Sequence, residues 1–156
     1  MRKAFKTLLG LADVCGDFLR QRTQTEIVPK LLQFLSKQLN ESKSCRPGYC
    51  YTTNYQLQLD ALSGLGTLAY RLSIGGKVLW SLILATLPYT NAKQPRPLQE
   101  AAHECLKQLQ RIEPESVWFY GSMFLKEQSI SSNSSSHLVA SNVNEYKRLD
   151  ALLFAV

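Results

Sequence analysis

The stretch AKQPRPLQEAAHECLKQLQRIEPESVWFY, residues 92–120, decides the fold class. Its apolar residues recur at steps of three and four, which is the spacing of one face of an α-helix. Pro97 and Pro114 stand where two helices begin, and proline costs little in a first turn because the amide hydrogen there has no partner within the helix. We therefore expect two helices joined at IEPES, and the first buries Leu98, Ala101, Ala102, Cys105, Leu106, Leu109 and Ile112.

The same period extends toward the N-terminus. An apolar stripe covers residues 5–19, and a second helix is expected to open with Thr25 as its cap and Pro29 in its first turn. After these we expect a third helix that contains residues 62–72, followed by a turn at residues 74–76 where Gly75 and Gly76 can adopt positive φ. A fourth helix is expected over residues 77–90. The helix that begins near Pro97 is then the fifth, and a sixth is expected over residues 115–127.

The spacing of these helices indicates a repeat. Three antiparallel pairs follow one another at roughly 45–50 residues, close to the period of about 40–47 residues in HEAT arrays. We predict an all-α protein with a HEAT-like α-solenoid of about three antiparallel helix pairs plus a short C-terminal helix. A closed six-helix bundle has the same local signals without the repeat register, and it remains the alternative.

The domain boundaries follow from a change in composition after Gln128. Residues 1–128 are expected to form the helical-repeat domain, and the serine-rich residues 129–141 are expected to form a flexible linker. Residues 142–156 are expected to form one short terminal helix with apolar positions at Val143, Tyr146, Leu149, Leu152 and Leu153.

Charge and cysteine content bear on the compartment. The net charge is +6, but no basic run exceeds two residues, which is typical of solvated helical faces. The longest apolar run, VLWSLILATLPY, is too short to span a bilayer. Asp13 and Asp17 argue against a mitochondrial presequence. Cys15 and Cys105 fall on apolar faces and are expected in the core. We therefore predict reduced cysteines and a cytoplasmic protein that also occurs in the nucleus. We predict no membrane partner.

No pattern of reactive residues indicates catalysis. Glu100 and His103 have the i, i+3 spacing of carboxylate-bridged metal sites in helical bundles, but such sites need two of these motifs and further glutamates. Cys45 and Cys50 lack two more zinc ligands at comparable spacing. We therefore predict a protein that is not an enzyme, with no catalytic residue, no metal site and no cofactor.

An aromatic group near the middle of the chain leaves one alternative open. Tyr49, Tyr51 and Tyr55, near Arg46, have the composition of a platform that stacks on single-stranded bases. Such a group more often packs a loop against helices, and we favour that interpretation. The alternative function is a general helical-repeat adaptor that contacts nucleic acid through its basic first third, although nucleic acid is the less favoured partner.

The segment VWFYGSMFL contains the candidate site. At 100° per residue, Trp118, Phe119 and Tyr120 point in three directions, so one neighbouring helix does not cover all of them. We expect the core to take the one aligned with Met123. The others are expected to meet the terminal helix or a partner protein, because exposed aromatic patches mark contact surfaces.

Several segments together resemble one family. DVCGDFLRQR, VPKLLQFL, LQLDALSGLGTLAYRL, KQPRPLQEAA and EPESVWF look like the C-terminal region of the Tel-two-interacting protein one family, the HEAT-repeat subunit of the TTT (Triple T) cochaperone complex. The resemblance runs from about Phe5 to the end and is most specific over residues 93–119. Family members are several-fold longer, so we expect a fragment, a truncated product or an incomplete gene model that is marginally stable or self-associates when isolated.

The resemblance implies a function. It implies a non-enzymatic scaffold that joins the other TTT-complex subunits. Through that complex, and with the heat-shock chaperone machinery, the scaffold supports the folding, stability and assembly of phosphatidylinositol-three-kinase-related kinases.

Overall fold

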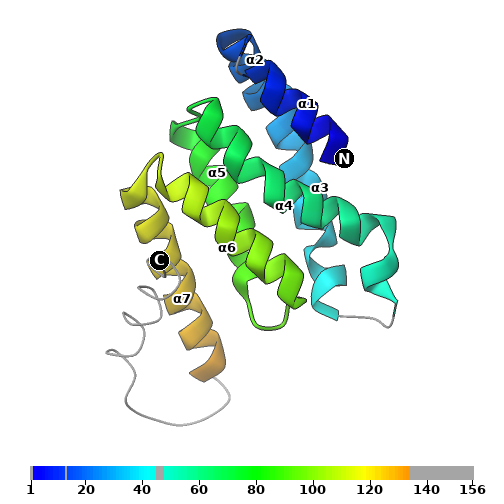
Figure 1. Ribbon diagram of the computed structural model, residues 1–156. Coiled ribbons are helices and arrows are strands. Elements are labelled where there is room, and N and C mark those ends of the chain that lie inside the picture. Colours follow the sequence, from blue (N-terminus) through cyan, green and yellow to red (C-terminus); the bar gives the residue numbers. More distant parts are fainter. Residues whose placement is uncertain (1, 13, 45–47, 134–156) are drawn as a thin grey trace.

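The computed structural model describes residues 2–12, 14–44 and 48–133 (Figure 1). Within these ranges the secondary structure is helical, without strands. Three short helical segments accompany the α-helices: a π-turn at Thr23–Ile27 and 3₁₀ turns at Tyr49–Tyr51 and Leu87–Thr90. The α-helices are α1 (Arg2–Ala12), α2 (Gly16–Arg22), α3 (Val28–Ser44), α4 (Thr53–Arg71), α5 (Gly76–Thr86), α6 (Arg96–Gln110) and α7 (Pro114–Asn133).

The helices stack in two layers. One layer runs α1, α4, α6, and the other runs α3, α5, α7, with each helix contacting the next in its layer. Figure 1 shows α1 and α7 at opposite ends of this row, so the row is open. The arrangement confirms the predicted all-α solenoid of helix pairs, and the closed bundle is not observed.

The contact between α4 and α6 is the centre of the core. A Cβ atom at Gly66 would lie 2.8 Å from the backbone oxygen of Cys105 and 2.9 Å from its Cα, so the two backbones nearly touch. The predicted buried face of α6 is confirmed except at Ile112, which is only partly buried. The buried residues on that face are Leu98, Ala101, Ala102, Cys105, Leu106 and Leu109.

A polar network ties the first two helix pairs together inside the core. The Tyr89 hydroxyl donates to the Leu35 carbonyl of α3 at 2.6 Å, and the Gln58 side-chain amide of α4 donates to the Tyr89 hydroxyl at 2.9 Å. The Tyr49 hydroxyl donates to the Gln58 carbonyl oxygen at 2.6 Å. Burial raises the pKa of Tyr89, so this hydroxyl stays protonated and keeps donating.

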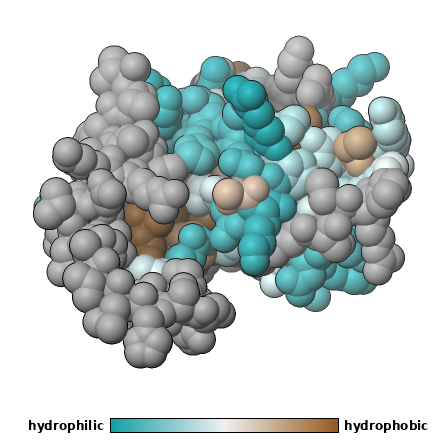
Figure 2. All heavy atoms as spheres, turned by 90° about the horizontal axis from the view of Figure 1, so that it is seen from below, coloured by the Kyte–Doolittle hydropathy of each residue, from teal (hydrophilic) through white to brown (hydrophobic). Residues whose placement is uncertain are grey.

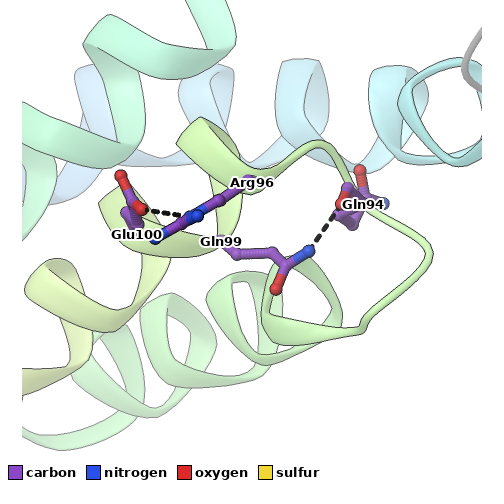
Figure 3. Close-up of polar contacts among 4 residues, drawn as sticks. All are labelled: Gln94, Arg96, Gln99 and Glu100. Atoms are coloured by element: carbon purple, nitrogen blue, oxygen red, sulfur yellow. Dashed lines mark hydrogen bonds and ion pairs between the residues drawn. The ribbon is translucent and has the colours of Figure 1, made fainter.

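The entry to α6 is fixed by short polar contacts (Figure 3). The Gln99 side chain donates to the Gln94 carbonyl at 2.6 Å, and Arg96 pairs with Glu100 at 2.9 Å. The buried Gln94 side chain also donates to the Leu39 carbonyl at 3.3 Å. The loop before α6 is therefore joined to the C-terminal half of α3, which sets the position of the third pair against the first.

The first predicted helix is wrong in one respect. The stripe over residues 5–19 is divided, because Cys15 leaves the helical conformation (φ −125°, ψ 38°) and a new helix starts at Gly16. The break changes the face that each following residue presents. Ala12 is buried as expected, but Cys15 is exposed and Phe18 is 67% exposed, so neither belongs to the core.

The predicted start of the second helix at Thr25 is also wrong, because the chain stays helical through this point. The Val28 amide donates to the Thr23 carbonyl five residues earlier, which widens the turn. The Thr25 hydroxyl donates back to the Gln21 carbonyl at 2.9 Å instead of capping a helix. Pro29 lacks an amide hydrogen, and the widened turn lets the helix continue past it.

The predicted turn after α4 is confirmed, with a different residue in the left-handed conformation. Ser73 has φ 47° and Gly76 has φ 61°, whereas Gly75 is extended. The Ile74 amide donates to the Ala69 carbonyl at 2.9 Å, a bond that closes a helix whose next residue is left-handed. The turn reverses the chain so that α5 returns behind α4.

The last helix is longer than expected. Pro114 is its first residue, as predicted, but α7 continues to Asn133 and so includes Ser129–Asn133, which we had assigned to the linker. The remainder of the predicted linker and the predicted terminal helix over 142–156 lie outside the described residues.

Candidate functional site

The three predicted aromatic residues lie near the start of α7 and have different surroundings. Val117 before them is buried, while Trp118 is 48% and Phe119 is 51% exposed. Tyr120 is partly buried, and its ring lies 5.3 Å from Phe119 in an edge-on arrangement. The spacing of 100° per residue therefore turns Tyr120 toward the molecule and leaves two large rings half exposed.

The alignment of the inward ring differs from the prediction. We expected the core to accept the ring aligned with Met123, but Met123 is 44% exposed. Tyr120 instead shares the inner side of α7 with Phe124 and Val117, which contact or belong to the core. This side faces α5 and α6, so the face of Met123 is the outer one.

Trp80 from α5 completes the site, and sequence reasoning missed it. Its ring lies 6.4 Å from that of Tyr120, with the planes tilted by 49°. The Trp80 indole nitrogen is buried and has no hydrogen-bond partner. Because α5 is apolar on most sides, no periodicity singled out this tryptophan. The pairing of α5 with α7 is what brings it to the site.

These residues line an open groove of about 750 Å³. Its walls come from the end of α6, the start of α7 and the middle of α5. Figure 2 shows the molecule from below, where most described atoms are hydrophilic and the largest hydrophobic patch lies in a hollow toward the left. The groove is lined by Trp80, Gln110, Pro114, Glu115, Ser116, Trp118, Phe119 and Tyr120.

The chemistry of the groove suits binding. Glu115 is the one carboxylate among its lining residues, and the rest offer aromatic rings, two hydroxyls, an amide and a proline ring. Among the described residues, no group of three or more His, Cys, Asp or Glu side chains lies close enough together to hold a metal ion. An apolar groove with a few polar groups at its rim fits a protein segment with apolar side chains.

The other sequence candidates are separated from the groove residues. Glu100 pairs with Arg96, while burial and then the nearby Lys107 lower the pKa of His103, so this imidazole is neutral at pH 7. Cys105 is buried as predicted, and burial raises its pKa to about 11, which makes the thiol unreactive. Cys50 is exposed, and its predicted neighbour Cys45 lies outside the described residues.

The tyrosine group divides. Tyr55 is buried and its ring meets that of Tyr49 edge-on at 5.9 Å, so two of the three pack the loop against the helices as favoured. Tyr51 is 89% exposed, and Arg46 lies outside the described residues. One exposed ring is less than the row of stacked platforms that single-strand binders use.

In the described part of the chain, each helix is too short or too polar to cross a membrane. This agrees with the short apolar run seen in the sequence.

Comparison with known proteins gives two kinds of match. Residues 1–118 match the family described as the TTI1 C-terminal TPR domain. The chain is 42% identical over 117 residues to the TELO2-interacting protein 1 homolog of Homo sapiens, and 40% identical over 116 residues to that of Mus musculus. These matches cover 75% and 74% of this chain but 11% of each relative, so the chain spans a small part of their length. No solved structure matches significantly.

Proposed function

Because this chain belongs to the TTI1 C-terminal TPR domain family, we propose that it is a non-enzymatic helical scaffold that binds another protein subunit. The observation that carries the proposal is the groove between α5 and α7, where two large aromatic rings stay half exposed beside the partly buried Trp80 and Tyr120. Aromatic residues of this kind are enriched among those that dominate binding energy in protein interfaces.

The free energy gained when a partner covers Trp118 and Phe119 supports a binding contact. Covering the exposed half of Trp118 and of Phe119 contributes about 0.8–1.5 kcal/mol each, half of the value for complete burial of a large side chain. Tyr120 meets the Phe119 ring edge-on and is itself packed against Trp80, so Phe119 loses little freedom when a partner covers it.

The name of the relatives points to the partner. They are called TELO2-interacting, and we propose that this chain contacts a TELO2-type subunit. The resemblance to the TTT scaffold extends the proposal to the support of phosphatidylinositol-three-kinase-related kinases with the heat-shock chaperone machinery, in the cytoplasm or nucleus. The chain spans 11% of its relatives, so these roles are proposed as a contribution of this segment.

Binding measurements on purified proteins test the proposal. Titration of the chain with a TELO2-type protein should show saturable binding, and the double substitution Trp118→Ala, Phe119→Ala should weaken it by about tenfold or more, equivalent to 1.4 kcal/mol. Phe18→Ala on α2 is the control, because Phe18 is an even more exposed aromatic residue at the other end of the row.

Two results would contradict the proposal. One is equal affinity of the double variant and the wild-type chain. The other is an equal loss in the Phe18→Ala control, since that would mean that exposed aromatic residues bind anywhere on the surface. Both variants should keep the circular dichroism of the wild-type chain, because the substituted side chains contribute little to the core.

A further inference from the structure

We propose that residues 143–153 of the same chain occupy the groove between α5 and α7 when no partner is bound. This segment lies outside the described residues, and its sequence and its distance along the chain from α7 point to the groove. The occupation of the groove is independent of the proposed function. The consequence that the segment competes with a partner rests on the proposed function.

The pattern of the segment fits the groove. Tyr146, Leu149 and Leu153 recur at steps of three and four, so a helix would carry them on one side. Ala151 would lie on the opposite side. Such a stripe presents one aromatic ring and two branched apolar side chains, and the groove offers aromatic walls of matching character.

The segment can reach the groove. Fifteen residues of α7 separate Trp118 from Asn133, a distance of about 22 Å at 1.5 Å per residue. Residues 134–142 connect Asn133 to the segment and span up to about 30 Å when extended. The chain is therefore long enough to turn back along α7.

The comparison with relatives sets this contact apart. The family match ends at residue 118, so Phe119, Tyr120 and the segment 143–153 all lie beyond it. Two of the groove's aromatic residues and the proposed occupant thus belong to the same unmatched stretch. The contact is proposed as a property of this chain and not of the family.

Tryptophan fluorescence of the full chain tests the contact directly. The chain contains two tryptophans, and both line the groove. The double substitution Leu149→Asp, Leu153→Asp should raise the Stern–Volmer constant for acrylamide quenching and shift the emission to longer wavelength. Ala151→Asp, the same change on the opposite side of the stripe, should leave both unchanged. Equal quenching of all three chains would overturn the proposal.

A second measurement keeps the wild-type stripe. With a photo-crosslinking benzoylphenylalanine in place of Tyr146, irradiation should join this position to peptides that contain Trp80 or residues 114–120 of the same molecule. Crosslinks elsewhere in the chain contradict the proposal. Crosslinks between molecules that grow with protein concentration also contradict it, because the occupant would then be a second copy.

The competition is tested separately with the TELO2-type protein. If the segment holds the groove in about nine molecules of ten, the apparent affinity of the wild-type chain falls about tenfold, and the Leu149→Asp, Leu153→Asp chain should regain it. Equal affinities of these two chains contradict competition. If neither chain binds, the proposed function fails, whereas quenching and crosslinking still decide whether the segment lies in the groove.

Discussion

The contacts of α6 with α4 and of α7 with α5 use opposite kinds of side chain. Between α4 and α6, Gly66 faces the backbone of Cys105 without room for a Cβ atom, and Ala102 is completely buried. Between α5 and α7, Trp80 and Tyr120 hold the helices apart, and an open groove remains.

The difference shows how one repeat array supplies both a permanent and an exchangeable surface. Small residues let the backbones of α4 and α6 pack closely without free space between them. No further protein segment fits into this contact. Between α5 and α7 the large rings leave part of the space open as the groove, and the groove has room for another protein segment. Substitutions should therefore act on stability at the first contact and on binding at the second.

The largest effect is expected from Ala102→Arg. The long charged side chain would enter a contact with no free volume, and an unpaired buried charge should lower the free energy of unfolding by about 4 kcal/mol or more. Thermal unfolding measures this as a large fall in melting temperature. Glu104→Arg on the exposed side of α6 is the control, and an unchanged melting temperature for both variants would remove the close contact from the interpretation.

A smaller loss is expected from Gly66→Ala. The new methyl group would meet backbone atoms of Cys105 at 2.8–2.9 Å, and overpacking of this kind costs about 1–3 kcal/mol. Gly10→Ala in α1 is the matched control because nothing lies within 4 Å of its added methyl group. That control should gain about 0.5–1 kcal/mol from helix propensity. Denaturant unfolding should thus show opposite signs for the same substitution.

The smallest effect on stability is expected within the groove. Phe119→Ala should lower the free energy of unfolding by less than about 1 kcal/mol because half of the ring is already exposed. Val117→Ala, two residues earlier on the same helix but buried, should cost about 1–2 kcal/mol despite the smaller change in volume. The reverse order in chemical denaturation would mean that Phe119 belongs to the core.

The sequence predicted the fold where one signal was unopposed. Pro97 opens α6, and the apolar period then runs without interruption, so the buried face of α6 follows directly. Thr25 and Pro29 gave the same start signal, but a widened turn absorbed the proline and the helix continued. A capping residue followed by a proline therefore predicts the start of a helix only where the preceding helix does not continue through a widened turn.

Half of the candidate site was visible in the sequence. Trp118, Phe119 and Tyr120 are consecutive, so helical geometry alone requires that they diverge. Trp80 comes from a helix that is apolar on most sides, and only the contact between α5 and α7 selects it. Which of the three rings turns inward also depends on that contact, and for this reason the alignment with Met123 was wrong.

The π-turn at Thr23–Ile27 has a consequence for how this protein tolerates changes in length. A π-turn contains one residue more than the α-helical turn it replaces. The additional residue rotates α3 by about 100° relative to a continuous helix from α2. Deleting one residue here would return Val28 and Leu31 of α3 to the phase of α2 and take them out of the core. Conversely, a second inserted residue should be absorbed at this turn more readily than within α4 or α6, where the close helix contacts fix the register.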